Sequence, residues 1–192
     1  RVFMLFVNNN TSQIFKWIHS GVESFGEMTN IPKNLQIKLA EDFEIYTVTI
    51  HRKLVSKLDG TVKFVFKLFD DNFIETVVMK YKHGYSICVS CQVGCRMGCE
   101  FCQSTKSGLI RNLFPGEILG QVLKSQRELG IRISNIVMMG IGEPLDNYDN
   151  TLKFLKIVNS KQGINIGYRH ISLSTCGLVD KIKKLANENL PI

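Results

Sequence analysis

Residues 87–102 of the chain read ICVSCQVGCRMGCEFC. The run opens on a short apolar segment, Ile87–Val89, which is typical of a buried strand, and it passes directly into a loop rich in cysteine. A helix is expected beyond the loop, over residues 115–129, because Pro115 can open it and Gly130 can end it. This order of strand, reactive loop and helix sets the pattern for the rest of the chain.

The same order recurs twice farther along the chain. A strand at Ile133–Met139 precedes a helix over Asn150–Asn159, and a strand at His170–Ser174 precedes a helix over Val179–Asn187. Three strand–helix units favour a parallel sheet with its reactive loops at the C-terminal ends of the strands. Three units do not close a barrel. The fold class that we expect is therefore α/β, with an incomplete (β/α) barrel.

The first 80 residues follow a different pattern. Apolar spacing predicts helices over residues 13–29, with Gly21 as an interruption, and over 33–41. Alternating residues and turn signals then predict an antiparallel meander. We expect a small helical plus antiparallel β N-terminal region at 1–80 and the N-terminal half of the β/α core at 81–192. The expected strands of the meander are Ile45–Ile50, Lys53–Leu58, Val62–Leu68 and Phe73–Val78.

Charge and cysteine content narrow the class of protein. Lys and Arg total 24 against 17 Asp and Glu, and the net charge of +7 suits a polyanion such as RNA, although many basic proteins bind no nucleic acid. Clustered cysteines in a chain with a sizeable core favour metal or redox chemistry in a reducing compartment over a secreted disulfide framework. The chain has no run of about 18 apolar residues, so the sequence predicts no membrane span. The first residue is not Met, so we expect a fragment or a processed chain.

Three cysteines, Cys95, Cys99 and Cys102, follow the spacing C-x3-C-x2-C. Iron–sulfur clusters normally take four cysteines, so three thiolates would leave one iron of a [4Fe–4S] cluster open. The spacing resembles the radical-SAM signature, which implies S-adenosylmethionine (SAM) at that iron. Zinc is the alternative, because Cys88 and Cys91 form a second C-x2-C pair. The two pairs are seven residues apart, against roughly 15–20 in the common zinc pattern, and zinc would leave Cys95 unused.

Two loops at expected strand ends carry candidate SAM contacts. Gly140–Pro144 follows a buried strand, its glycines allow close approach of the backbone to a ligand, and Glu143 adds a carboxylate. Ser174 ends the next strand and offers a hydroxyl. Taken singly, Gly140–Pro144 is also an ordinary turn, and Ser174 is also a cap for the following helix.

Longer motifs resemble one family, the radical-SAM dual-specificity 23S rRNA and tRNA adenine-C2 methyltransferases. The resemblance covers residues 13–192, and Gln13–Ile18 is similar to the family's N-terminal domain. Residues 1–12 do not resemble the family's lead-in. The motifs that carry the resemblance are Ile74–Val77, Cys88–Cys95 with Cys99 and Cys102, Gly108–Leu113, Met139–Leu145 and Leu173–Gly177.

The resemblance implies how the cofactors are used. The family first methylates one of its own cysteines, and a second SAM, cleaved reductively at the cluster, activates that methyl group for transfer to adenine. The methyl-carrying cysteine would lie beyond Ile192, and Cys176 stands where the family usually has Ser. We therefore expect this chain to bind a cluster and not to turn over. The implied cluster ligands are Cys95, Cys99 and Cys102, and the implied SAM contacts are Gly142, Glu143 and Ser174.

Two further roles follow from the resemblance alone. Glu75 would accept the proton that leaves C2 of adenine, and Cys88 would release the protein–RNA adduct by forming a disulfide. By residue type, Glu75 is also a polar position on a half-exposed strand, and Cys88 is also a small buried hydrophobe.

The resemblance also implies partners and a location. We expect 23S rRNA and tRNA as substrates, a flavodoxin-like one-electron reductant, no membrane, a cytoplasmic location and a monomer at full length. One alternative is an adenine-C8 rRNA methyltransferase of antibiotic resistance, although the Gly142–Pro144 triplet favours C2. The other alternative is a non-catalytic metal-binding RNA-binding protein. The basic residues expected to include RNA contacts are Lys16, Lys33, Lys80, Lys82, Lys106 and Arg111.

Overall fold

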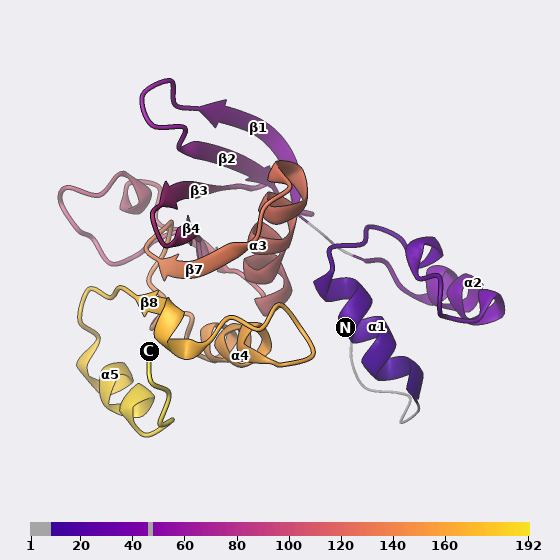
Figure 1. The fold of residues 1–192 in the computed structure, drawn as a ribbon. Coiled ribbons are helices and arrows are strands. Elements are labelled where there is room, and N and C mark those ends of the chain that lie inside the picture. Colours follow the sequence, from indigo (N-terminus) through magenta and orange to yellow (C-terminus); the bar gives the residue numbers. More distant parts are fainter. Residues whose placement is uncertain (1–8, 46–47) are drawn as a thin grey trace.

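The structure is a computed structural model that describes residues 9–45 and 48–192 (Figure 1). Part of the expected Ile45–Ile50 strand and most of segment 1–12 lie outside these residues. The described chain forms a helical N-terminal part followed by a mixed sheet with helices (Figure 1). The α/β class expected from the sequence is confirmed.

The N-terminal part contains α1 (Asn9–His19), the short helix η1 (Phe25–Glu27) and α2 (Lys33–Asp42). The helix expected over 13–29 is therefore too long. It ends at His19 because Gly21 takes a positive φ of 85°, which turns the chain away from the helix axis. The apolar residues that would have continued the helix instead form a small core of this part. Its buried members are Val22, Phe25, Met28 and Ile31.

The main sheet has six strands in the order β1-β2-β3-β4-β7-β8. Neighbours are antiparallel from β1 to β4 and parallel from β4 to β8. The expected meander and the expected β/α core thus share one sheet, and the expected division after residue 80 falls inside the strand that ends at Tyr81. The strands are β1 (Thr49–Val55), β2 (Val62–Lys67), β3 (Phe73–Tyr81), β4 (Gly84–Cys88), β7 (Ile133–Met138) and β8 (Ile171–Leu173).

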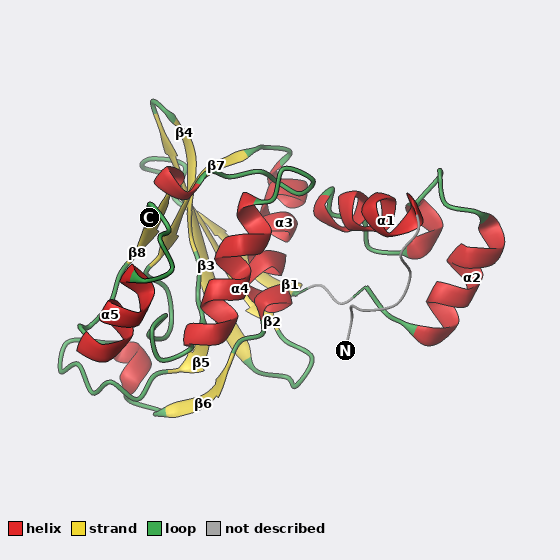
Figure 2. Cartoon of the chain, turned by 90° about the horizontal axis from the view of Figure 1, so that it is seen from below, coloured by secondary structure: helices red, strands yellow, loops and turns green. Residues whose placement is uncertain are grey.

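Three longer helices follow the parallel strands: α3 (Pro115–Leu129), α4 (Tyr148–Asn159) and α5 (Val179–Ala186). Helices α3 and α4 pack together on one side of the sheet (Figure 2). A short helix, η3 (Tyr168–His170), leads into β8. Because a right-handed crossover returns the chain to the same side, successive parallel strands place their helices in one layer.

The two faces of the meander differ in burial. On β2 and β3 every second side chain is buried, including Phe64, Phe66 and Ile74, and these side chains belong to the main core. The side chains between them are half-buried or exposed. We call the side with the buried residues the covered face and the other side the open face. Antiparallel partners share a face, so the register assigns each paired residue of the meander to one of them, whereas His51 lies in a bulge of β1.

A second, smaller sheet pairs β5 (Gln92–Gly94) with β6 (Leu109–Asn112). These two strands were not expected from the sequence. They enclose a loop that contains the short helix η2 (Gln103–Thr105). The second sheet is therefore the base on which the cysteine loop stands.

The helical N-terminal part docks on α3. The Arg127 guanidinium donates to the Gly21 carbonyl at 2.6 Å, and Lys124 forms an ion pair with Glu23. On the other side, the His19 ring lies so close to Gly163 that a Cβ there would be 2.7 Å from the ring. The two parts are thus joined by specific contacts, although their cores are separate.

In residues 9–45 and 48–192, the structure contains no helix that is both long enough and apolar enough to cross a bilayer.

Candidate functional site

The cysteine loop spans residues 95–108 and is closed at its base by β5 and β6. The Cys95 N–H donates to the Gly108 carbonyl at 3.0 Å, and the Gly98 N–H donates to the Thr105 hydroxyl at 2.9 Å. Gly94 has a φ of 72°, and a Cβ at this position would lie 2.0 Å from the Gly108 oxygen. Glycine is therefore required where the two strands come closest. The loop projects from the main sheet (Figure 1).

The structure places the three predicted cluster cysteines on one loop. Cys95, Cys99 and Cys102 are free thiols on this loop, and the Cys102 N–H donates to the Cys99 carbonyl at 3.0 Å. Burial raises the pKa of Cys95, and the neighbouring Cys102 and Cys99 raise that pKa further. Bound iron would displace the thiol protons and stabilise the thiolates. The donor set therefore fits an iron–sulfur cluster.

In the described part of the chain, no three His, Cys, Asp or Glu side chains are arranged around one metal ion. A single zinc ion needs its ligands to converge on one point, whereas each thiolate of a cubic cluster binds a different iron.

The Gly140–Pro144 loop lies against the segment that leads into the cysteines. The Ile141 carbonyl accepts from the Cys91 and Gln92 N–H groups at 2.9 and 3.1 Å. Gly142 has a φ of 105°, and a Cβ there would be 2.5 Å from the Gln92 Cβ. These contacts fix the loop directly beside the base of the cysteine loop.

Glu143 is 4% exposed, and backbone N–H groups use both of its carboxylate oxygens. Oε1 accepts from Leu145 at 2.9 Å, and Oε2 accepts from Cys176 at 2.7 Å. The Glu143 N–H donates to the Gln92 side chain at 2.8 Å. Glu143 therefore connects its own loop to β5 and to the loop that follows β8.

Ser174 follows β8 on the loop that Glu143 holds. Its N–H donates to the Met138 carbonyl at 3.3 Å, and the residue is half-buried. Gly142, Glu143 and Ser174 are thus gathered at the C-terminal ends of β7 and β8, as the sequence predicted for their positions.

Glu75 and Cys88 lie on the open face of the main sheet. Cys88 is directly opposite Val77 in the β3–β4 register, and Glu75 is two residues from Val77 along β3, so all three share that face. Burial raises the pKa of the half-buried Cys88 thiol. The Glu75 carboxylate pairs with the Lys63 ammonium at 2.6 Å.

Ser90 is a residue of the site that the sequence did not reveal. It is fully buried, and its hydroxyl donates to the Glu75 carbonyl at 2.6 Å while accepting from the Ile141 N–H at 3.0 Å. Gln121 on α3 holds the Ser90 backbone and the Thr76 hydroxyl. Ser90 thus connects the Glu75 strand, the approach to the cysteines and the glycine loop.

Asn147 supports the same region from the start of α4. Its side-chain amide donates to the Cys91 and Leu113 carbonyls at 2.7 and 2.8 Å, on the two sides of the cysteine loop. The only sequence signal for Asn147 is its place next to the Gly140–Pro144 motif. From sequence alone, an Asn in such a loop is interpreted as a turn or cap residue, because its hydrogen-bond partners are not known.

Arg111 proves to be an internal connector. Its guanidinium binds the buried Glu117 carboxylate through two hydrogen bonds of 2.8 Å, and its Nε donates to Asp70. Hydrogen bonding to Arg111 holds the pKa of Asp70 far below its usual range. Arg111 is therefore largely engaged within the chain.

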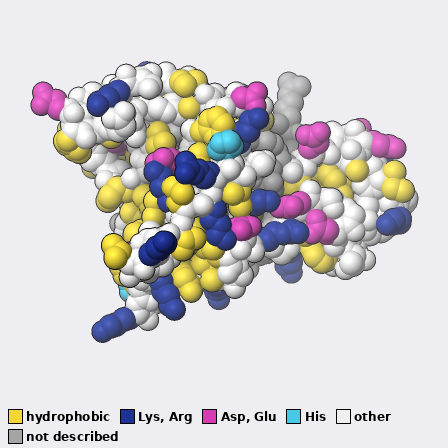
Figure 3. All heavy atoms as spheres, turned by 90° about the horizontal axis from the view of Figure 1, so that it is seen from above, with side chains coloured by type: hydrophobic (Ala, Val, Ile, Leu, Met, Phe, Trp, Pro, Cys, Tyr) yellow, Lys and Arg dark blue, Asp and Glu magenta, His cyan; other side chains and the backbone are white. Residues whose placement is uncertain are grey.

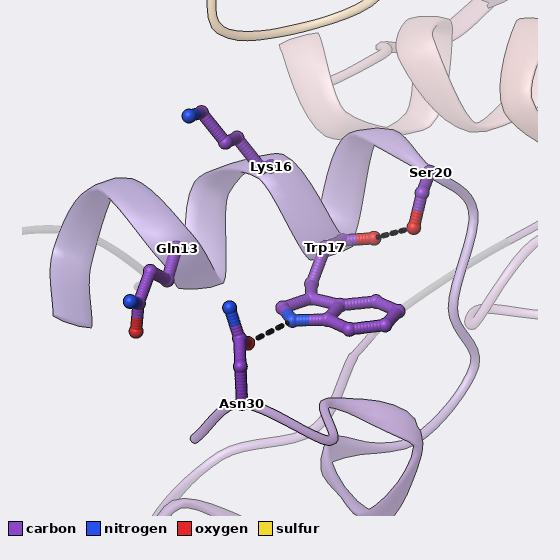
Figure 4. Close-up of a pocket in the computed structure, with 5 residues that line it drawn as sticks. All are labelled: Gln13, Lys16, Trp17, Ser20 and Asn30. Carbon is purple, nitrogen blue, oxygen red and sulfur yellow. Dashed lines mark hydrogen bonds between the residues drawn. The ribbon is translucent and has the colours of Figure 1, made fainter.

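A hollow on the N-terminal part is lined by α1 and the turn before α2 (Figure 4). The Trp17 indole N–H donates to the Asn30 side chain at 2.5 Å, whereas Lys16 extends away from the indole ring (Figure 4). This contact fixes α1 to the turn that precedes α2. The hollow contains none of the residues of the cysteine loop, so it is separate from the candidate site.

Comparisons with known proteins agree with this geometry. The family model described as "Radical SAM superfamily" matches residues 89–191, and the chain belongs to that superfamily. Residues 8–45 match the model "Ribosomal RNA large subunit methyltransferase N-terminal domain". Membership implies a [4Fe–4S] cluster and SAM, in agreement with the cysteine loop.

Individual relatives are more specific. The chain is 61% identical over 180 residues to a "Probable dual-specificity RNA methyltransferase RlmN" of Clostridium tetani, and 58% identical over 181 residues to a protein of the same name from Clostridioides difficile. These matches cover 94% of the chain and 52% and 53% of the relatives. The chain thus spans about half the length of the curated relatives it matches.

A solved structure gives the same result. The crystal structure of a radical SAM methyltransferase from Sphaerobacter thermophilus matches with a TM-score of 0.88 at 40% identity. The match covers 95% of this chain and 55% of that protein.

Proposed function

We propose that the protein is an enzyme that methylates C2 of adenosine in 23S rRNA and tRNA. The observation that carries the proposal is the placement of Glu75 and Cys88 on one face of the sheet, at the edge that leads into the cysteine loop. The relatives named as dual-specificity RNA methyltransferases support the substrate class. The proposal concerns the activity of the whole protein, because this chain spans only about half the length of its relatives.

The cofactor side of the proposed site uses the two sets of residues described above. Cys95, Cys99 and Cys102 would hold the cluster, which when bound supplies reductive cleavage of SAM. Glu143 would contact SAM, and the backbone N–H groups that bind both of its carboxylate oxygens would hold it in position. Gly142 would allow the backbone to approach SAM, and the Ser174 hydroxyl would donate a hydrogen bond to it.

The substrate side uses the open face. Glu75 would accept the C2 proton, since a carboxylate held by Lys63 on an accessible strand can reach a base that has left its stack. Cys88 would form a disulfide with the cysteine that carries the adduct and so release the RNA. A thiol with a raised pKa is mostly protonated at neutral pH and needs a base when it reacts.

The remaining expectations belong to the same proposal. Residues 1–80 would act as an RNA-binding accessory region and residues 81–192 as part of the catalytic core. The partners would be 23S rRNA, tRNA and a flavodoxin-like one-electron reductant, for a monomeric, cytoplasmic protein. The net charge of +7 and the RNA methyltransferase relatives support this set.

The test has two steps. First, the chain is reconstituted with iron and sulfide under anaerobic conditions; we expect the absorption and electron paramagnetic resonance of a [4Fe–4S] cluster, with a spectrum that changes on addition of SAM. Substitution of Cys99 by Ala should abolish the cluster, whereas Cys176→Ala should not. A colourless preparation with stoichiometric zinc would contradict the cluster.

Second, the whole protein, at the full length of its relatives, is expressed in cells that lack C2-methyladenosine. We expect mass spectrometry of digested 23S rRNA and tRNA to show 2-methyladenosine, and Glu75→Gln and Cys88→Ala to abolish it. The appearance of 8-methyladenosine would show the alternative C8 specificity. RNA without either product, from a protein that holds its cluster and binds RNA, would favour the non-catalytic alternative.

A further inference from the structure

The open face of the meander carries a group of cationic and aromatic side chains next to the candidate site. Arg52 is opposite Val65, and Lys67 is opposite Phe73, so the β1–β2 and β2–β3 registers place these residues on the same face as Glu75. Lys63 belongs to that face as well, because it pairs with Glu75. None of these cations was among the residues expected to contact RNA.

Aromatic rings accompany the charges. The His51 and Phe73 rings lie 4.8 Å apart at the edge of this face, and Phe73 is 45% exposed. Figure 3 shows Lys and Arg side chains interspersed with hydrophobic ones on the side of the molecule that β1 occupies. A flat surface with cations and exposed rings matches the chemistry of RNA, because phosphates take the cations and unpaired bases stack on rings.

Carboxylates on the face are each paired with a lysine. Glu75 is bound to Lys63, and Asp71 is bound to Lys67 at 2.6 Å. Both pairs are exposed to solvent, so each contributes little to stability and its lysine can turn toward a phosphate. A carboxylate that faces a polyanion would otherwise repel it, and Lys63 removes that repulsion at the position where Glu75 must meet the base.

We propose that the open face of β1–β3, through Arg52, Lys63 and Lys67, binds the phosphate backbone of the RNA and presents the target adenosine to Glu75. The inference rests on the proposed function and specifies which surface recognises the substrate. An acidic protein such as the reductant would also be attracted by cations. RNA is favoured because the exposed rings and the proposed base Glu75 share this face.

The test measures binding of a fluorescent RNA hairpin to the 192-residue chain by anisotropy between 50 and 200 mM salt. We expect Arg52→Gln with Lys67→Gln to lower the slope of log affinity against log salt by about 2, one unit for each phosphate contact. The matched control, Lys156→Gln with Lys184→Gln, removes the same charge. Lys156 on α4 pairs with Glu188 and Lys184 on α5 pairs with Asp149, both outside the meander, so the control slope should equal that of the wild type.

A second comparison tests the part of Lys63. Lys63→Gln should weaken binding, Glu75→Gln should strengthen it, and the double variant should lie between the two. Near-ultraviolet circular dichroism checks that each variant keeps its fold. Equal slopes for the open-face pair and its control would overturn the inference while leaving the proposed function in place.

Two other results would also be decisive. If the open-face variants keep their RNA affinity but lose affinity for flavodoxin, the face binds the reductant and the inference is wrong. If the wild-type chain does not bind RNA in 50 mM salt, the inference is wrong, whereas the proposed function of the whole protein is decided by the 2-methyladenosine assay.

Discussion

The side-chain amide of Gln121 forms hydrogen bonds with both backbone groups of Ser90. Its Oε1 accepts from the Ser90 N–H at 2.8 Å, and its Nε2 donates to the Ser90 carbonyl at 2.9 Å. Both residues are fully buried. A single side chain on α3 therefore replaces the strand partner that β4 lacks where it turns toward the cysteine loop.

Substitution of Gln121 by Leu tests this contact. The change leaves the Ser90 N–H and carbonyl and the Thr76 hydroxyl without their partner in the core, and each such group costs about 1–3 kcal/mol. We expect the free energy of unfolding in urea to fall by about 3 kcal/mol in total. Glu128→Gln, on the same helix but in a solvent-exposed pair with Lys53, should change it by less than about 0.5 kcal/mol. Equal effects of the two substitutions would contradict the role of Gln121.

Gly142 is expected to reject any side chain. At Gly142→Ala, the new Cβ would lie 2.5 Å from the Gln92 Cβ, in addition to the strain of a φ of 105°. Gly130→Ala is the control: its φ is 62° and no heavy atom lies within 4 Å, so only a strain of about 1–2 kcal/mol remains. Thermal unfolding should show a clearly larger loss of stability for Gly142→Ala, and the reconstituted protein should bind SAM more weakly. Similar melting temperatures for both variants would show that the glycine loop can move away from Gln92.

His19 makes stability depend on pH. Burial lowers its pKa below 6.5, although a hydrogen bond to the Phe15 carbonyl partly opposes the shift. The unfolded chain then binds a proton more readily than the folded chain, so stability is complete above pH 6.5 and is lost as the pH falls toward the lowered pKa. Urea midpoints at pH 7.5 and 5.5 should differ for the wild type.

The pH effect has a matched pair of controls. His19→Phe removes the buried titrating ring and should reduce the difference between the two midpoints. His51→Phe, at an exposed position on β1, should retain the wild-type difference. The same difference in all three proteins would show that other groups cause the loss in acid.

Arg111 should not tolerate Lys. Arg111→Lys keeps the charge but loses the two-point contact with Glu117, whose side chain is 2% exposed. We expect a loss of about 1–3 kcal/mol in the free energy of unfolding, because one hydrogen bond to a buried carboxylate is left unmade. Arg96→Lys is the control, since Arg96 is 62% exposed in its pair with Asp146 and should tolerate the change. A neutral Arg111→Lys would indicate that water replaces the missing donor.

Local signals predicted the elements that depend on local interactions. The α3 helix has the expected bounds because Pro115 can start a helix and Gly130 takes the left-handed conformation that ends it. The helix expected over 13–29 was wrong for the same kind of reason: Gly21 was noted as a break, but its positive φ redirects the chain completely. The β5–β6 sheet could not be seen, because its short strands pair across the whole cysteine loop.

The candidate site divides in a similar way. Cysteine spacing and the glycine motif mark the cofactor loops, since their chemistry requires particular residue types at fixed separations. Ser90 and Gln121 belong to no such motif. A Ser and a Gln in apolar segments can be recognised as part of the site only when the folded structure shows that they contact each other. The assigned roles of Glu75, Cys88 and the cofactor residues remain predictions for the experiments described above.

The cysteine loop stands on its own two-stranded base, which Val93 of β5 joins to the main hydrophobic core. Cys95, Cys99 and Cys102 take no part in that core, and Phe101 between them is 94% exposed. We therefore expect the base of the loop to fold with the core whether or not an iron centre is bound. Air damage to the metal would leave a standing scaffold, and repair would require iron, sulfide and electrons rather than a new protein.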